Sequence, residues 1–108
     1  GTLITNSSHH FPPYVGSGEP IENNIDFIAE LHEQGKTKIV LTTSRPEKFR
    51  QLTIMELQTK GIPFDELVMG LPHCQRVIIN DFARSNPYPS CKAINIPRNT
   101  DDLMEYFL

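Results

Sequence analysis

The sequence predicts an α/β fold, a Rossmann-like parallel sheet with helices on both faces. Apolar, β-branched runs at 38–42 and 76–80 have the pattern of strands buried on both faces, and shorter runs at 66–69 and 92–96 are expected to be strands as well. Helical periodicity lies on either side of the first run. Alternation of helices with continuous apolar strands is typical of a parallel sheet covered by helices.

The first helix is predicted over 20–34, with Gly35 just past its end. A terminal helix is expected over 101–108, capped by Asn99 or Thr100. The apolar residues of the first helix recur at helical spacing on one stripe: Ile21, Ile25, Ile28 and Leu31.

A second helix is predicted directly after the strand at 38–42. Ser44 and Glu47 have the spacing of a capping box, and the helix is expected to stop at 60–61, where a glycine follows a lysine. Its inward-facing residues are expected to be the large apolar ones: Phe49, Leu52, Met55 and Leu57.

The chain of 108 residues is expected to form one domain, 1–108. A net charge of −3, with acidic and basic residues interspersed, gives no basic field for nucleic acid. No apolar run approaches the roughly 20 residues that cross a bilayer, so no membrane association is expected. Cys74 and Cys91 are expected to be free thiols, which favours the cytoplasm.

Residues 5–19 form a polar, proline-containing loop of a length that often serves as a lid or binding loop. We expect a flap here, with a small cap domain or none. The adjacent His9 and His10 are expected to be solvated rather than metal ligands. His73 beside Cys74 lacks the paired spacing of a zinc site.

Ligands of open parallel sheets bind beyond the carboxyl ends of the strands. That rule selects 43–44, 70–71 and 80–81, which follow three predicted strands and are expected to converge on one crevice.

Thr43 and Ser44 lie where a strand leads into a helix. Unpaired backbone N–H groups and hydroxyls at such a place suit an anion. The same residues are also common helix caps, and the two roles are compatible.

Asp81 follows an apolar strand and Asn80. A carboxylate at the mouth of a buried strand is stabilised by a hard cation such as Mg²⁺, which prefers oxygen ligands. Asn-Asp is equally a good turn-forming pair, and position alone leaves both interpretations open.

Three segments together resemble the haloacid dehalogenase (HAD) superfamily of phosphatases. Residues 1–4 (GTLI) are similar to the tail of its Asp-x-Asp-Gly-Thr-Leu signature. Residues 38–45 (KIVLTTSR) resemble its second motif, and 77–81 (VIIND) resemble its fourth, a hydrophobic strand ending in acidic residues. The order and spacing of the segments agree with a compact member, over essentially the whole chain.

The resemblance implies a mechanism. The leading Asp of the first motif attacks the phosphoryl group and forms an aspartyl-phosphate, and the second Asp serves as general acid and then as base. Thr43 is then the catalytic hydrogen-bond donor to the transferring phosphoryl group, and Asp81 and Asn80 hold Mg²⁺. The implied phosphate-binding residues are Gly1, Thr2, Thr43, Ser44 and Arg45.

The sequence departs from the family pattern at two places. Both first-motif aspartates would lie immediately before Gly1, so we expect a missing upstream segment consisting of the first strand and Asp-x-Asp, without which the chain is inactive. Leu71 stands where a cation is expected, since close relatives read Gly-Lys-Pro. Arg45 and Arg76 are the candidate replacements. Arg45 lies on the correct rim, whereas Arg76 is expected at the base of its strand, far from the site.

The resulting expectation is a Mg²⁺-dependent phosphomonoesterase for a small phosphorylated metabolite, a sugar or nucleotide phosphate. An open site of this kind is compatible with a homo-oligomer or with fusion to a larger enzyme. The alternative is a non-catalytic HAD-like domain that serves interaction or regulation. A receiver-like nucleotide-binding domain is a third interpretation, which the lack of a Gly-rich phosphate loop disfavours.

Overall fold

The computed structural model describes residues 1–5 and 18–107. Most of the predicted flap at 5–19, with His9 and His10, lies outside these residues. The described elements in chain order are α1 (Glu22–Glu33), β1 (Val40–Thr42), the 3₁₀ turn η1 (Glu47–Phe49), α2 (Arg50–Thr59), β2 (Glu66–Val68) and the 3₁₀ turn η2 (Leu103–Phe107). None of the described helices is long and apolar enough to cross a membrane.

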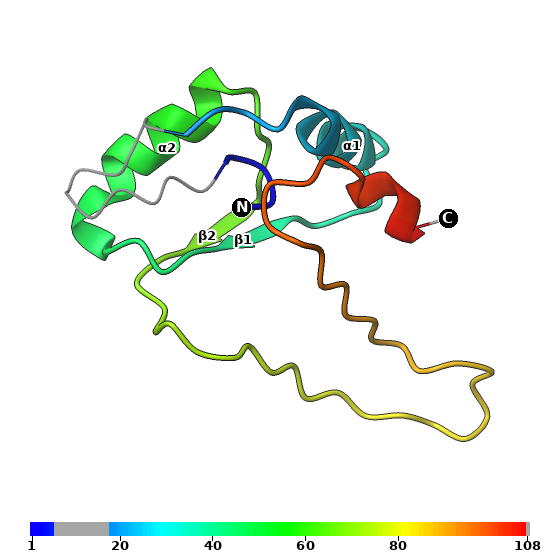
Figure 1. The fold of residues 1–108 in the computed structure, drawn as a ribbon. Coiled ribbons are helices and arrows are strands. Elements are labelled where there is room, and N and C mark those ends of the chain that lie inside the picture. Colours follow the sequence, from blue (N-terminus) through cyan, green and yellow to red (C-terminus); the bar gives the residue numbers. More distant parts are fainter. Residues whose placement is uncertain (6–17, 108) are drawn as a thin grey trace.

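β1 and β2 form a two-stranded parallel sheet, as Figure 1 shows. The paired residues are Val40 with Glu66, Leu41 with Leu67 and Thr42 with Val68. The connection between the two strands contains α2, because parallel neighbours need a crossover. The fold is therefore mixed helix and strand, with a small parallel sheet.

Both long helices pack on one face of this sheet (Figure 1). Ile25 of α1 and Leu57 of α2 meet Ile62 in a buried cluster, against which Leu41 and Leu67 of the strands pack. The opposite face is open, because Val40 is 50% exposed and Val68 is 41% exposed. The cover expected on that second face is not found among the described residues.

The helix predicted after β1 forms, but its inward face differs from the prediction. Leu52 and Met55 are largely exposed, whereas Thr53, Glu56 and Leu57 are buried. The prediction was wrong for Leu52 and Met55 because the inner side of α2 is occupied by a polar network around Glu56. The predicted capping box is also absent, since η1 begins after Pro46 without a side-chain cap.

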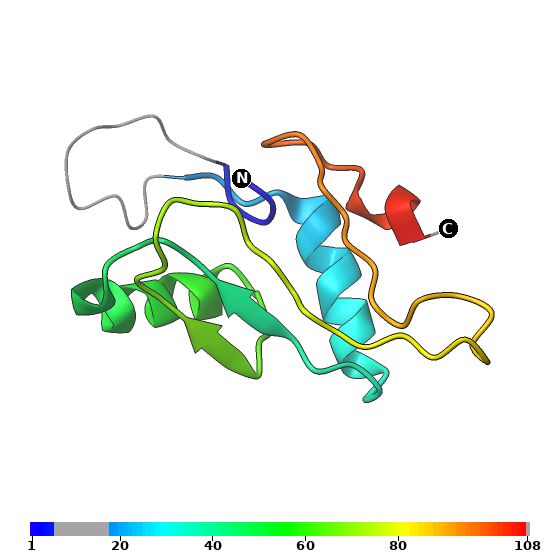
Figure 2. The ribbon, with the colours of Figure 1, turned by 90° about the horizontal axis from the view of Figure 1, so that it is seen from below.

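The strands predicted at 76–80 and 92–96 do not form in the described chain. Figures 1 and 2 show the chain after β2 swinging away from the sheet as coil and returning beside α1. Ile78 is 75% exposed and Ile79 is 94% exposed. A strand forms only where its backbone groups pair with a neighbour, and among the described residues neither segment pairs with the open edge of β1 or of β2.

The terminal helix is shorter than predicted, and it is a 3₁₀ helix at 103–107. It contacts α1, where Phe107 stacks edge-on against Phe27 with ring centroids 4.8 Å apart. The Thr100 hydroxyl donates to the Pro97 carbonyl and does not cap the helix.

A fully buried asparagine in α1 joins the two ends of the described chain. The Asn24 amide donates to the carbonyls of Thr2 (2.8 Å) and Thr100 (2.7 Å), and its oxygen accepts from the Leu103 N–H (3.2 Å). Asn24 lies on the apolar stripe between Ile21 and Ile25. A polar residue at a core position of a helix is a signal that it satisfies other buried polar groups.

We expect Asn24→Ala to lower the free energy of unfolding by about 3 kcal/mol, because two carbonyls and one N–H lose their partner. Urea denaturation measures this change. Asn23→Ala is the matched control, since Asn23 is exposed and makes one bond to Asp101. Equal effects of the two substitutions would contradict the structural role of Asn24.

Candidate functional site

The loops that follow β1 and β2 are joined by backbone hydrogen bonds. The Thr43 N–H donates to Val68 O (2.9 Å), and the Leu71 N–H donates to Thr43 O (3.2 Å). The Gly70 N–H donates to Arg45 O (2.8 Å), with Gly70 in the left-handed region at φ 73°. Two of the three positions expected to converge, 43–44 and 70–71, therefore meet at one edge of the sheet. The third, 80–81, forms no hydrogen bond with these loops and lies in the segment that swings away from the sheet (Figure 1).

Thr43 and Ser44 keep donors available at this edge. The Thr43 hydroxyl oxygen accepts from the Arg45 N–H (3.2 Å), which leaves its O–H free to donate to a ligand. Among the described residues, the Ser44 N–H has no acceptor. Both groups are half-buried, and they are the donors that suit a phosphoryl oxygen.

The side chain of Arg45, in the same loop, is bound to a buried carboxylate of α2. Its guanidinium donates to Glu56 Oε1 (2.7 Å) and lies 3.5 Å from the Thr53 hydroxyl. The Glu56 side chain is only 4% exposed. In the structure, Arg45 therefore anchors the loop to α2, and its predicted role in phosphate binding stays a prediction.

Glu56 has a second cationic partner. Lys60 Nζ lies 3.0 Å from Glu56 Oε2, and it also donates to the carbonyl of Gly18 (3.0 Å). Burial acts to raise the pKa of Glu56, but hydrogen bonds from Arg45 and Lys60 outweigh it and hold that pKa below 4.5. Sequence reasoning missed this network. Its signal was the helical spacing of Thr53, Glu56 and Lys60, which puts all three on one face of α2.

Arg76 lies at the candidate site, contrary to the prediction. One guanidinium nitrogen, Nη2, donates to Ser44 Oγ (3.2 Å), and the other, Nη1, donates to the carbonyls of Pro72 (3.0 Å) and Cys74. The prediction placed Arg76 at the base of a strand. Because no strand forms at 76–80, the chain turns at 72–76 and brings the guanidinium back to Ser44.

Gly1 and Thr2 are fixed against the far end of the chain. The Asn99 N–H donates to Gly1 O (2.8 Å), and the Asn24 amide holds Thr2 O. Gly1 and Thr2 both stay predicted phosphate ligands.

Asp81 and Asn80 lie in the exposed excursion after β2. The Asn80 amide donates to Ser90 Oγ (2.8 Å), which leaves its carbonyl oxygen available, and Asp81 forms no hydrogen bond or ion pair with other described residues. One carboxylate and one amide oxygen are hard ligands that fit Mg²⁺, which is commonly bound through few protein oxygens. Residues 1–5 and 18–107 contain no cluster of three metal-binding side chains.

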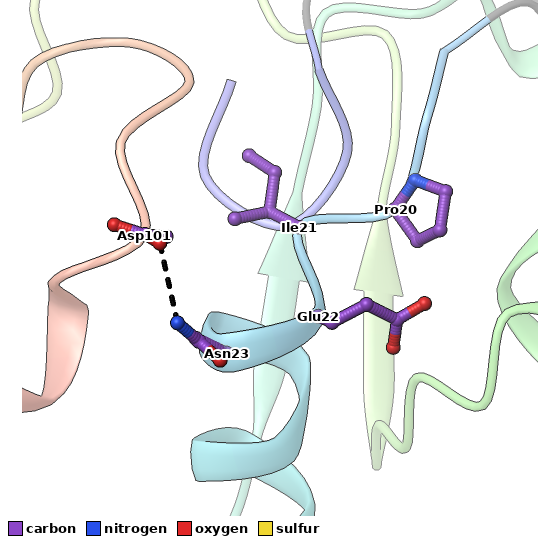
Figure 3. Close-up of a pocket in the computed structure, with 5 residues that line it drawn as sticks. All are labelled: Pro20, Ile21, Glu22, Asn23 and Asp101. Carbon is purple, nitrogen blue, oxygen red and sulfur yellow. Dashed lines mark hydrogen bonds between the residues drawn. The ribbon is translucent and has the colours of Figure 1, made fainter.

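A hollow of about 350 Å³ at the start of α1 is lined by none of the predicted site residues (Figure 3). Asn23 donates to Asp101 (3.2 Å) across it, and Glu22 also borders it. Its two carboxylates and lack of a cation make it unsuitable for an anion.

Cys74 and Cys91 are free and exposed.

The buried ion pair predicts a pH dependence of stability. The pKa of Glu56 is lowered in the folded state, so its contribution is present above its ordinary value of 4.5 and is lost as the pH falls through the folded pKa. We expect the native chain to have a higher free energy of unfolding than Glu56→Gln at about pH 7. This difference should shrink below about pH 4, where Glu56 takes up a proton. Urea titrations at several pH values measure it.

Glu33→Gln is the control, because Glu33 is exposed and forms no ion pair among the described residues. A Glu56→Gln difference that stays constant through the acid range would contradict the assignment.

No protein-family model matches the chain, and no match is found among curated proteins or solved structures.

Proposed function

We propose that the chain is the body of a Mg²⁺-dependent phosphomonoesterase of the HAD type, acting on a small phosphorylated metabolite such as a sugar or nucleotide phosphate. One observation carries the proposal. The Thr43–Ser44 loop presents an O–H and an N–H at the carboxyl end of β1, beside the loop that follows β2. This is the edge at which parallel sheets bind their ligands.

The nucleophile, in this proposal, is an aspartate on a strand upstream of Gly1. Two features support such a strand. Among the residues that the structure describes, β1 is paired on one side only, and the apolar residues Val77, Ile78 and Ile79 are exposed where a buried strand was predicted. A further strand beside β1 would supply hydrogen-bond partners and cover apolar surface, and it would extend the sheet toward the Rossmann-like arrangement.

The residues of this chain have separate roles in the proposed reaction. The upstream carboxylate attacks phosphorus while the ester P–O bond breaks and the leaving alcohol takes a proton from the second upstream aspartate; water then releases phosphate. Thr43 donates its O–H to a phosphoryl oxygen, where negative charge builds up. Bound Mg²⁺, held by Asp81 with Asn80, would offset repulsion between the anionic nucleophile and the anionic substrate.

A non-catalytic domain of the same type is the second candidate. The specific observation in its favour is Leu71, an apolar residue whose N–H bonds to Thr43 O and which stands where the HAD pattern has a lysine. The residues preceding Gly1 discriminate the two: Asp-x-Asp favours the enzyme, and other residues favour the binding module.

In the longer chain with its upstream segment, we expect Mg²⁺-dependent phosphate release from a generic aryl phosphate. Thr43→Val should lower kcat roughly 100-fold, because one donor to the developing charge is removed. Thr59→Val, at the exposed end of α2, is the matched control. Absence of turnover, together with Mg²⁺ binding that Asp81→Asn does not change, would rule out the enzyme.

The upstream strand also predicts a change in exposed apolar surface. Residues 77–79 should bind a hydrophobic dye in the 108-residue chain and lose most of that binding in the longer chain. Ile79→Lys, at a side chain that is 94% exposed here, should lower dye binding of the short chain. Equal dye binding by the short and long chains would argue against a strand at this edge.

A further inference from the structure

Arg76 carries a positive charge that no acidic group among the described residues balances. All three of its hydrogen bonds go to neutral oxygens, two carbonyls and the Ser44 hydroxyl. A guanidinium has five N–H donors. The three bonds use both hydrogens of Nη1 and one of Nη2, which leaves the Nε–H and one Nη2–H without an acceptor among the described residues.

Arg45 is unsuited to the same task. Its guanidinium contacts the carboxylate of Glu56, whose side chain is 4% exposed. Moving Arg45 to a ligand would take one of its cationic partners from a buried carboxylate. Such a loss is costly in a buried position. Arg76 would lose no ion pair, since its three hydrogen bonds go to neutral oxygens and its other two donors have no acceptor among the described residues.

Leu71 and Arg76 together account for the missing cation. The Leu71 N–H is bonded to Thr43 O, so position 71 lies next to the loop but supplies no charge. The turn at 72–76 returns the chain to the same loop, and it fixes the Arg76 guanidinium through Pro72 and Cys74. Arg76, five residues after Leu71, therefore provides a cation next to this loop.

We propose that Arg76 is the phosphate-binding cation of the Thr43–Ser44 loop. The proposal deepens the function given above and rests on it for the identity of the ligand, a phosphate monoester dianion. Two donors on one guanidinium suit bidentate contact with two phosphate oxygens. The Ser44 N–H and the Thr43 O–H provide the neighbouring donors on the same loop.

Binding of inorganic phosphate tests the assignment without any turnover. Affinity is measured by calorimetric titration on the 108-residue chain and on the longer chain, for the native protein, Arg76→Gln and Arg76→Lys. We expect Arg76→Gln to weaken binding roughly 10- to 100-fold, the range for a charge-assisted hydrogen bond. Arg76→Lys should give an intermediate affinity, because it keeps the charge and loses the fork.

Arg84→Gln is the matched control, since Arg84 is exposed in the same excursion and forms no bond with described residues. Its affinity should equal that of the native chain. Far-ultraviolet circular dichroism checks that each variant keeps its helices. In the longer chain, Arg76→Gln should also raise KM for the aryl phosphate more than Arg84→Gln does.

The two proposals fail differently. If the longer chain turns over substrate and Arg76→Gln leaves its phosphate affinity unchanged, the role of Arg76 is overturned and the proposed enzymatic function stands. If phosphate binding depends on Arg76 but no form shows turnover, the role of Arg76 is supported and the proposed enzymatic function is overturned. A folded native chain that binds no phosphate in either length would overturn the role of Arg76.

Discussion

The single-sided pairing of β1 is the constraint on which the other features of the structure depend. Among the described residues β1 pairs with β2 alone, so the backbone groups along its other edge are unpaired. Residues 76–80 do not pair with that edge, and they stay exposed despite their apolar sequence. Asp81, which follows this stretch, is consequently solvent-exposed and makes no bond to the Thr43 loop.

Buried polar groups join segments of the chain that the small sheet does not connect. Asn24 satisfies carbonyls from both ends of the chain, and Glu56 joins the loop after β1 to α2 and, through Lys60, to Gly18. Each of these two networks stabilises the fold only when all its hydrogen bonds are made, because a buried donor or acceptor without its partner costs the whole desolvation penalty. The ordering of the candidate site thus depends on residues that contact no ligand.

The sequence predicted local structure well wherever a segment carries its own pattern. α1, β1, α2 and β2 form close to their predicted ranges, and Gly35 and Gly61 follow the two helices with positive φ. These features depend on periodicity and on glycine, which act over a few residues.

The predictions that failed concern partners distant in sequence. An apolar run at 76–80 indicates a strand only if a neighbour exists to pair with it, and Leu52 and Met55 indicate an inward face only if no polar network takes that face. For the site, adjacency of 43–44 and 70–71 followed from parallel pairing, as predicted. The position of Arg76 was not predicted, because the turn at 72–76, and not a strand, brings its guanidinium to Ser44.

In the proposed site, the loop after β1 uses one cation to hold it and another to bind the anion, and a single arginine does not supply both. Arg45 is bonded to a carboxylate that is nearly inaccessible to water, so its charge is compensated within the fold. A ligand competing for it would have to offset the loss of an ion pair to a buried carboxylate, which costs several kcal/mol. Within the described part of the chain Arg76 bonds only to neutral oxygens, and an incoming phosphate would add to its contacts without breaking an ion pair. The burial of Glu56 therefore decides which of the two arginines remains available to a ligand.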